Sequence, residues 1–327
     1  MKAITLKNFG GPEIMQIESV DNPEPGPNQV RVKVMATSVN RADIIQRQGN
    51  YPPPKGESKI LGLEVAGVID SLGSDVNDWT AGDRVMGLVA GGGYAEYALM
   101  YAGHLIPIPI DMDYTTAAAI SETYITAFLN IYLIGDLMAG ETALLHGGGG
   151  GVNTAAIQLC RTLTPKANLI VTASPRKIDR VAALGVDRVV NYRQQDFASE
   201  VRSFTRNHGA DLILDHIGAD YLSSNLKALA VGGRLLVIGV TSGAVATINL
   251  AHLMVKRQRI FGSVIRARSV DEKAQITAEF RDRVMPHIIE RKIEPIIHHI
   301  YPLEAASEAH REMENSCHFG KIVLAVQ

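Results

Sequence analysis

Short apolar runs separated by turns dominate the first part of the chain. Such runs lie at residues 3–7, 15–20, 29–38, 61–71 and 84–89. Short strands at regular spacing, with proline and glycine between them, are typical of an all-β, barrel-like domain. The three prolines at 52–54 cannot donate backbone hydrogen bonds, so we predict a loop there.

The middle of the chain has a different pattern, in which apolar runs alternate with segments of helical spacing. Helical spacing spans residues 115–133, and the apolar run 143–145 then leads into the five glycines at 147–151. Residues 152–160 and 177–184 again have helical spacing. Further short apolar runs lie at residues 168–173, 188–192, 210–215 and 233–239. Strands that alternate with helices predict a parallel, doubly wound sheet.

The last part of the chain is predicted to alternate between strands and helices. We expect strands at 246–250, 260–265, 296–301 and 320–326, and helices at 273–290 and 304–314. The fold class is therefore α/β, with a Rossmann-type doubly wound parallel sheet and a β-rich second domain. We place the nucleotide-binding domain at 122–265, inserted into a β-rich domain made of 1–121 and 266–327.

Composition and charge narrow the class of protein. The 327 residues are 46% apolar, and a formal net charge of −2 provides no bulk attraction to nucleic acid or anionic membranes. Only Cys160 and Cys317 are present, which excludes a disulfide framework and fits a reducing compartment. The N-terminus is too short and too charged for a signal peptide, and no apolar run approaches the ~20 residues that span a bilayer. We therefore expect a cytoplasmic protein.

The run of glycines marks a candidate cofactor site. Glycines let the backbone approach a diphosphate closely, and the first turn of the following helix offers free N–H groups and a positive dipole end. We therefore predict that a dinucleotide contacts Gly148, Gly149, Gly150, Gly151 and Val152. The run lacks the strict G-x-G-x-x-G frame, so this prediction depends on the strands and helices that follow it.

The end of the next apolar run indicates which nicotinamide cofactor is bound. In NAD-preferring folds an acidic residue at this point bonds the ribose 2′-hydroxyl. Here the run 168–173 is followed by Ser174, Arg176 and Lys177, without a carboxylate. Cations pair with a 2′-phosphate at charge-assisted strength. The sequence favours NADPH, and an ordinary solvated helix start is the alternative interpretation.

Motifs along the whole chain resemble those of the medium-chain dehydrogenase/reductase superfamily. They lie at residues 40–49, 51–54, 60–67, 82–85, 91–97, 108–109, 151–159, 190–192, 215–218 and 320–324. Within the superfamily the chain is similar to the zinc-independent NADPH:quinone oxidoreductases, specifically their tumour-suppressor-induced branch. The resemblance implies a GroES-like fold for the β-rich domain, and hydride transfer from NADPH to a quinone.

The resemblance also bears on zinc. Zinc alcohol dehydrogenases of this superfamily carry a cysteine where this chain has Asn40, and Gly-His-Glu where it has Gly62, Leu63 and Glu64. An amide and an alkyl group cannot replace the thiolate and imidazole that zinc prefers. No histidine is paired with a cysteine at ligand spacing. We therefore expect no catalytic metal.

The resemblance further implies the residues of the reaction site. On the loop that the family turns toward the nicotinamide, Tyr51 is the best candidate to contact the quinone oxygen, and Asn40 would orient cofactor or substrate. Asp43 and Gln46 are further candidates for proton supply, although Asp43 is equally well explained as a helix cap or an ion pair with Arg47. The remaining cofactor contacts would be Thr126, Tyr192, Gly239, Val240, Val264, Ile265 and Lys321.

One departure from the family pattern lies in the glycine run. The family usually has Ala-x-x-Gly-Val-Gly, whereas this chain has Gly147 for the alanine and Asn153 for the last glycine. The Asn153 side chain could crowd helix–sheet packing, shift the diphosphate or hydrogen-bond the phosphate. His146 and His216, at strand ends, are weaker candidates for cofactor contact.

Two other functions stay open. The first is an NADPH-dependent enone or alkenal reductase, which delivers the same hydride to a C=C bond. The second is an NADPH-binding protein with weak catalysis that acts as a sensor or binds a nucleic-acid partner, as crystallin relatives of the family imply. A basic strip for that partner would comprise Arg257, Arg259, Arg266 and Arg268, although interspersed charges usually form a solvated face.

The resemblance finally implies an oligomer. Family members pair through an edge strand of the nucleotide domain, here at 247–250 or 260–264. Such pairing would cover an otherwise open sheet edge. We expect a homodimer, with a tetramer as the alternative.

Overall fold

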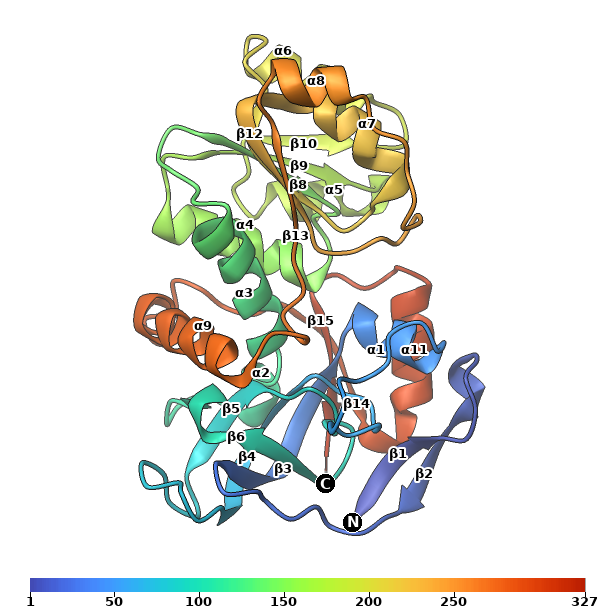
Figure 1. The fold of residues 1–327 in the computed structure, drawn as a ribbon, viewed down its shortest axis with the longest axis vertical. Coiled ribbons are helices and arrows are strands. Elements are labelled where there is room, and N and C mark those ends of the chain that lie inside the picture. The colour runs from blue at the N-terminus through green and yellow to red at the C-terminus, as the bar shows by residue number, and fades with distance from the viewer. Residues whose placement is uncertain (327) are drawn as a thin grey trace. The chain divides into compact units, whose positions relative to one another are not determined.

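The computed structural model describes residues 1–326 and divides into two compact units (Figure 1). Unit 1 combines Met1–Ile125 with the described residues from Ile265 onward, and unit 2 is Thr126–Val264. The first boundary falls inside helix α3 (Ser121–Phe128), whereas the sequence predicts it at 121/122. Both ends of the chain belong to unit 1.

Unit 1 is built on a seven-stranded sheet. In sheet order its strands are β14 (Ile297–Pro302), β15 (Lys321–Ala325), β3 (Gln29–Val39), β4 (Glu64–Leu72), β5 (Arg84–Leu88) and β7 (Leu105–Pro107), and β6 (Tyr97–Tyr101) also pairs with β3. One edge of β3 is shared, because β6 pairs with residues 29–33 and β15 with residues 36–39. A separate two-stranded sheet joins β1 (Lys2–Leu6) to β2 (Met15–Ser19).

The alternation of apolar and polar residues explains how β3 is buried. Val30, Val32 and Val34 are at most 2% exposed and belong to the core of unit 1. Arg31 and Lys33 between them point to the opposite face, as the two-residue period of a strand requires. The predicted β-rich, barrel-like domain is therefore confirmed, and its last strand comes from the C-terminal part of the chain.

Helices cover the sheet of unit 1. They are α1 (Arg41–Arg47), α2 (Tyr114–Ala117), α9 (Val270–Arg283), α10 (Met285–Ile289) and α11 (Ala306–Glu314). The single helix predicted at 273–290 is wrong, because α9 starts earlier, at a capping box of Ser269 and Glu272, and ends at Arg283. Pro286, which has no N–H to donate, lies in the first turn of α10, where that donor is not needed.

Unit 2 contains a six-stranded parallel sheet. In sheet order its strands are β10 (Arg188–Asn191), β9 (Asn168–Ala173), β8 (Thr142–His146), β11 (Ala210–Asp215), β12 (Leu229–Val237) and β13 (Arg259–Gly262). The direction of winding reverses between β8 and β11, which in such sheets is where the crevice for a nucleotide opens. The Rossmann-type sheet predicted from the sequence is confirmed.

Helices connect the strands of unit 2. They are α4 (Gly151–Leu163), α5 (Ile178–Ala182), α6 (Phe197–Phe204), α7 (Ala219–Ala228) and α8 (Leu250–Val255). The strand predicted at 246–250 is wrong, because Asn249 caps α8 by accepting from the N–H groups of Ala251 and His252. The strand predicted at 260–265 starts one residue earlier and already ends at Gly262.

The sequence predicts no apolar run near the length of a membrane span, and one helical stretch shows that this prediction is wrong. Tyr114–Ile134 is long and apolar enough by length and composition, and 78% of its most apolar window is buried. It contains α2, α3 and a π-helical turn, Leu129–Ile134. A helix that is apolar all round is also what the core of a large domain requires, so the test does not separate the two settings.

Candidate functional site

The loop that carries Asn40 and Tyr51 begins at a helix cap. The backbone N–H of Asn40 donates to Oδ2 of Asp43 over 2.8 Å, and the N–H of Gly62 donates to Oδ1 over 3.0 Å. Asp43 is fully buried, and burial raises the pKa of its carboxyl to about 6. Of the two structural explanations from the sequence, the helix cap is confirmed. The ion pair with Arg47 is wrong, because Arg47 binds Glu314 instead.

A directed chain of hydrogen bonds reaches the same carboxylate. Arg47 can only donate, so its Nη1 donates to Nδ1 of His310 over 3.1 Å. The neutral ring then carries its proton on Nε2, which lies 3.0 Å from the Tyr94 hydroxyl, and that hydroxyl donates to Oδ2 of Asp43 over 3.3 Å. Burial lowers the pKa of His310 to about 3, in agreement with the neutral ring. The chain holds α11 and α1 together and ends on Oδ2 of Asp43, whereas Oδ1 accepts from the N–H of Gly62.

Asn40 lies in a second buried polar cluster. Nζ of Lys321 donates to Oδ1 of Asn40 over 2.6 Å and to Oε1 of Glu64 over 2.9 Å. Nδ2 of Asn40 donates to the same Oε1 over 2.9 Å, and Oε2 of Glu64 accepts from the backbone N–H of Glu122 over 2.8 Å. Lys321 is 3% exposed and Glu64 is fully buried. The ammonium predicted to contact the cofactor is thus already held by acceptors within unit 1.

Gln46 is also held inside unit 1. It is 4% exposed, and its Nε2 donates to the carbonyl of Lys59 over 3.0 Å. Its Oε1 is buried without a hydrogen-bond partner. Like Asp43, Gln46 therefore supports the loop between α1 and residue 60 from within, and neither side chain is open to an acceptor molecule in this structure.

Tyr51 contrasts with these residues because its hydroxyl has no hydrogen-bond partner among the described residues. The guanidinium of Arg266 lies over the Tyr51 ring, 5.1 Å from its centre, and Nη1 of Arg266 lies 3.4 Å from the Tyr51 carbonyl. Nε of Arg266 donates to the carbonyl of Ala90 over 2.8 Å. Such stacking fixes the ring while leaving the hydroxyl free.

The position of Arg266 corrects one interpretation of the sequence. Arg266 is only 5% exposed, so it cannot belong to a solvated basic strip with Arg257, Arg259 and Arg268. Its contact with Tyr51 joins residues far apart in the chain, and no spacing in the sequence signals it.

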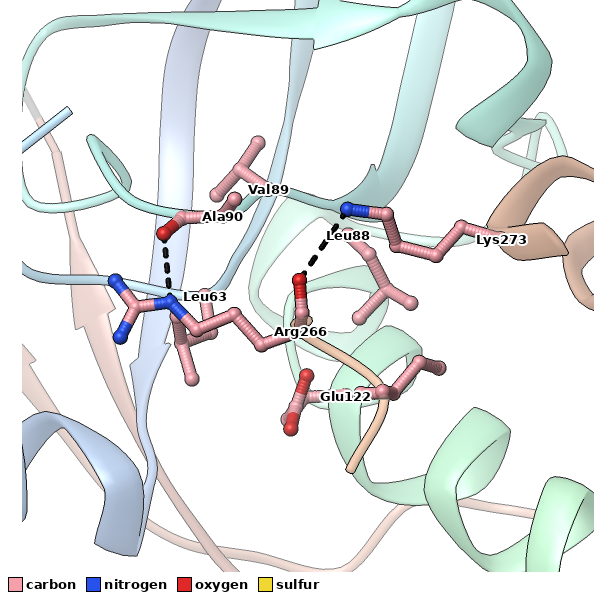
Figure 2. Close-up of a pocket in the computed structure, with 8 residues that line it drawn as sticks. Leu63, Leu88, Val89, Ala90, Glu122, Arg266 and Lys273 are labelled. Carbon is pink, nitrogen blue, oxygen red and sulfur yellow. Dashed lines mark hydrogen bonds between the residues drawn. The ribbon is translucent and has the colours of Figure 1, made fainter. Parts of the chain in front are cut away.

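Arg266 also borders a small cavity in unit 1 (Figure 2). The cavity has a volume of about 10 Å³, close to the space that one water molecule needs. It is lined by Leu63, Leu88, Val89, Ala90, Glu122, Ile265, Arg266 and Lys273. Figure 2 shows Arg266 among these residues, bonded through its side chain to Ala90 and through its carbonyl to Lys273. No motif in the sequence indicates a role for Glu122 or Lys273.

In unit 2 the glycine run forms a tight turn from β8 into α4. Gly147 has a φ of +78°, and a Cβ there would lie 2.6 Å from the His216 ring. A Cβ on Gly148 would lie 2.4 Å from Val171. The N–H groups of Gly147 and Gly148 donate to the Thr172 carbonyl, over 3.1 Å and 2.9 Å. The first N–H groups of α4 then remain for a diphosphate, so the turn fits a dinucleotide.

Asn153 does not project toward that diphosphate position. Its Nδ2 donates to the carbonyls of His146 and Gly147, over 2.5 Å and 3.3 Å, and the residue is 2% exposed. The side chain therefore holds the turn from within, and its effect on the diphosphate stays a prediction. At this position the family has a glycine, which has no side chain to form these hydrogen bonds.

His146 is a packing residue, so its proposed contact with the cofactor is wrong. It is fully buried, and its Nε2 lies 2.8 Å from Oδ1 of Asn225. Since Nδ2 of Asn225 donates to Asp215, the amide oxygen faces the ring and the proton lies on Nε2. Burial lowers the pKa of His146 to about 3. His216 lies beside Gly147, at the turn itself.

The residues predicted to hold a 2′-phosphate follow β9 and β10. Ser174 comes directly after β9, and Arg176 and Lys177 lie in a 3₁₀ turn, Pro175–Lys177. Arg176 is exposed, and Tyr192, directly after β10, is 39% exposed. A cationic and an aromatic side chain are thus available at the carboxyl ends of neighbouring strands.

The remaining predicted cofactor contacts are distributed over both units. Thr126 has a buried hydroxyl without a partner. Gly239 and Val240 follow β12, and Val240 and Val264 are each 48% exposed. Ile265 is 8% exposed and lines the cavity of unit 1. Their contacts with a cofactor stay predictions.

The side chains at this site also show which metal ligands are available. In residues 1–326, no group of three or more histidine, cysteine, aspartate or glutamate side chains is placed to hold a metal ion. The positions that carry cysteine and histidine ligands in zinc relatives hold Asn40, bonded to Lys321 and Glu64, and the apolar Leu63. These donors do not fit the preference of zinc for thiolate and imidazole.

Comparison with known proteins identifies the class. Residues 26–110 match the alcohol dehydrogenase GroES-like domain, and residues 184–324 match the zinc-binding dehydrogenase family. Quinone oxidoreductase of Rattus norvegicus is 32% identical over 327 residues, which cover 99% of this chain and 97% of that protein.

Solved structures agree with these matches. Quinone oxidoreductase of Escherichia coli, complexed with NADPH, has a TM-score of 0.90 at 26% identity, covering 99% of this chain and 100% of that chain. An NAD-dependent alcohol dehydrogenase has a TM-score of 0.87 at 32% identity, with both chains fully covered. The chain belongs to the medium-chain dehydrogenase/reductase superfamily, with quinone oxidoreductases among its full-length relatives. It is an NAD(P)H-dependent oxidoreductase.

Proposed function

We propose that this oxidoreductase transfers a hydride from NADPH to a quinone without a metal ion. The observation that carries the proposal is the full-length similarity to quinone oxidoreductases. The site residues are consistent with it, because a quinone carbonyl is electron-poor and accepts hydride without a Lewis acid. Asn40 stands at a position where zinc relatives carry a metal ligand. Its side chain is instead hydrogen-bonded to Lys321, which forms a buried ion pair with Glu64 at 2.9 Å.

The preference for NADPH over NADH is part of this proposal. It is supported by the exposed Arg176 and its neighbours Ser174 and Lys177 at the end of β9. The structure of a relative in complex with NADPH points the same way, whereas another similar structure is described as NAD-dependent. Charge at the 2′-position of the ribose decides between the two cofactors.

Tyr51 is the residue that we propose for contact with the acceptor. Its free hydroxyl can donate to an oxygen on which negative charge develops, and its ring is held in place by Arg266. Asn40, Asp43 and Gln46 would act by holding the loop, since Asn40 is 7% exposed and the other two less.

We also propose a homodimer in the cytoplasm. β13 is the last strand of its sheet, and an unpaired strand edge is open to a second copy. Exposed apolar side chains flank it, with Leu250 67%, Met254 73% and Val255 71% exposed on α8. The cytoplasmic location is supported by the two free cysteines, Cys160 and Cys317.

The test is cofactor consumption with an ortho-quinone, a para-quinone and an α,β-unsaturated ketone, each with NADPH and with NADH. The proposal expects fast turnover of quinones with NADPH. Turnover of the ketone alone would instead make the protein an enone reductase. Binding of NADPH without turnover of any acceptor would contradict both and support a binding protein.

A further inference from the structure

The cavity beside Arg266 brings together a carboxyl and a cation that no hydrogen bond pairs. Nη2 of Arg266 is buried without a hydrogen-bond partner. The carboxyl of Glu122 lines the same cavity and has no partner among the described residues, although the Glu122 backbone is fixed by Glu64. An unpaired buried donor is costly, so a water in this cavity, which both residues line and which has room for one, would satisfy both groups.

The groups around the Glu122 carboxyl come from five segments of unit 1. They are Glu64 on β4, Asp43 on α1, Lys321 on β15, Lys273 on α9, and Arg266. Loss of hydration and repulsion by Glu64 outweigh the cations and raise the pKa of Glu122 to about 8. At neutral pH the carboxyl therefore retains its proton, which is rare for a glutamate.

Tyr51 is coupled to this cavity. After its own loss of hydration, the Glu122 charge is the largest influence that raises the pKa of Tyr51, and Arg266 lowers that pKa. Arg266 contacts both the Tyr51 ring, at 5.1 Å, and the cavity that Glu122 lines. Arg266 thus links the cavity that Glu122 lines to the ring of a tyrosine whose hydroxyl is free to donate.

We propose that Glu122 stores the proton that Tyr51 delivers to the acceptor, and that Arg266, which contacts both the Tyr51 ring and the cavity, positions Tyr51 and a water in that cavity. The inference rests on the proposed function, in which bound NADPH supplies the hydride. Reduction of a quinone to a hydroquinone takes that hydride, with two electrons, and one proton. The O–H bond of Tyr51 breaks to protonate the acceptor oxygen, the O–H bond of Glu122 breaks to restore Tyr51, and Glu122 regains its proton from solvent.

The first test needs neither cofactor nor acceptor. Carboxyl ¹³C NMR of the protein labelled at glutamate, compared with Glu122→Gln, identifies the Glu122 signal and its titration. We expect a midpoint at about pH 8. A midpoint near 4, typical of a solvated glutamate, would overturn the proposal even if quinone turnover is fast.

The second test is the pH profile of kcat with a quinone. In the wild type, kcat should fall tenfold per pH unit above about pH 8, because Glu122 has then lost its proton. Glu122→Gln should lower kcat at pH 7 by about 10-fold or more, less than the ~10²–10⁴-fold of a direct acid, and should abolish that fall. Glu57→Gln is the matched control, since it makes the same substitution at another carboxyl whose charge acts on Arg266.

The outcomes are distinguishable. If the Glu122→Gln profile coincides with that of the wild type while quinones turn over, the proton store is wrong and the proposed function stands. If the wild type reduces no quinone, the proposed function fails, and NMR still decides the state of Glu122. Arg266→Lys provides a separate measurement on the free protein: it should shift the alkaline tyrosinate titration assigned by Tyr51→Phe, and an unchanged titration contradicts the role of Arg266.

Discussion

At the scale of single residues, a directed set of hydrogen bonds holds the loop that carries Asn40 and Tyr51. Arg47 donates to His310, His310 to Tyr94, and Tyr94 to Asp43. Each donor has a single orientation, because the first group cannot accept and the last is a carboxylate. Asp43 in turn fixes the N-terminus of α1, so a residue near the C-terminus positions Asn40.

The hydroxyl in the middle of this chain can be removed alone. We expect Tyr94→Phe to lower the free energy of unfolding by about 1–3 kcal/mol, because it leaves His310 with a buried, unpaired N–H. Urea denaturation measures this change. Tyr101→Phe, whose hydroxyl has no partner among the described residues, should change it by less than about 0.5 kcal/mol. Equal effects of the two variants would contradict the role of the chain.

The buried neutral histidines should make stability depend on pH. The pKa of His146 is about 3 in the folded protein, below its ordinary value, so the unfolded chain takes up a proton first as the pH falls. The stabilisation by His146 is therefore complete above pH ~6.5 and is lost toward pH 3. Relative to His146→Gln, the wild type should lose about 1.4 kcal/mol per pH unit in this window. If the free energy of unfolding depends on pH in the same way in both proteins, His146 does not contribute this pH dependence.

At the scale of elements, some helix and strand boundaries are marked by local residues in the sequence, and others are not. The end of β8 is marked in the sequence by five glycines, and the structure has the turn there. The segment 246–250 has apolar residues that suit a strand, yet Asn249 starts a helix in it, because a short apolar run has no periodicity that separates the two.

The turn after β9 contains Arg176, whose charge we expect to favour NADPH over NADH. Arg176→Ala should weaken NADPH binding by about 10-fold or more, since a charge-assisted hydrogen bond contributes about 1.5–3 kcal/mol. NADH binding should not change. Calorimetric titration of both cofactors measures this, with Arg180→Ala, another exposed arginine one turn along, as the control. An equal loss for both cofactors would show that Arg176 does not recognise the 2′-phosphate.

At the scale of the whole molecule, the proposed dimer depends on the open edge of unit 2. The N–H of Ser263 donates inward to Val237, so by alternation the N–H of Ile260 points away from the sheet. Ile260→Pro should therefore abolish strand pairing between two copies while retaining the sheet of each.

Sedimentation equilibrium checks this expectation. The wild type should be a dimer and Ile260→Pro a monomer, whereas Val245→Ser, which removes a 91% exposed apolar side chain outside the strand, should remain dimeric. A monomeric wild type would remove the proposed interface, and a tetramer would require a second one.

The sequence by itself determined the fold class, the glycine turn and the family, because these depend on periodicity and on short motifs within a few residues of one another. It also marked Tyr51 and Asp43 through a motif on one loop. Only the tertiary structure decided what these side chains contact. Arg266 reaches Tyr51, and Lys321 reaches Asn40, across more than two hundred residues of chain, and loss of hydration rather than residue type raises the pKa of Glu122. Such contacts follow from how distant segments pack together, for which no spacing along the chain provides a signal.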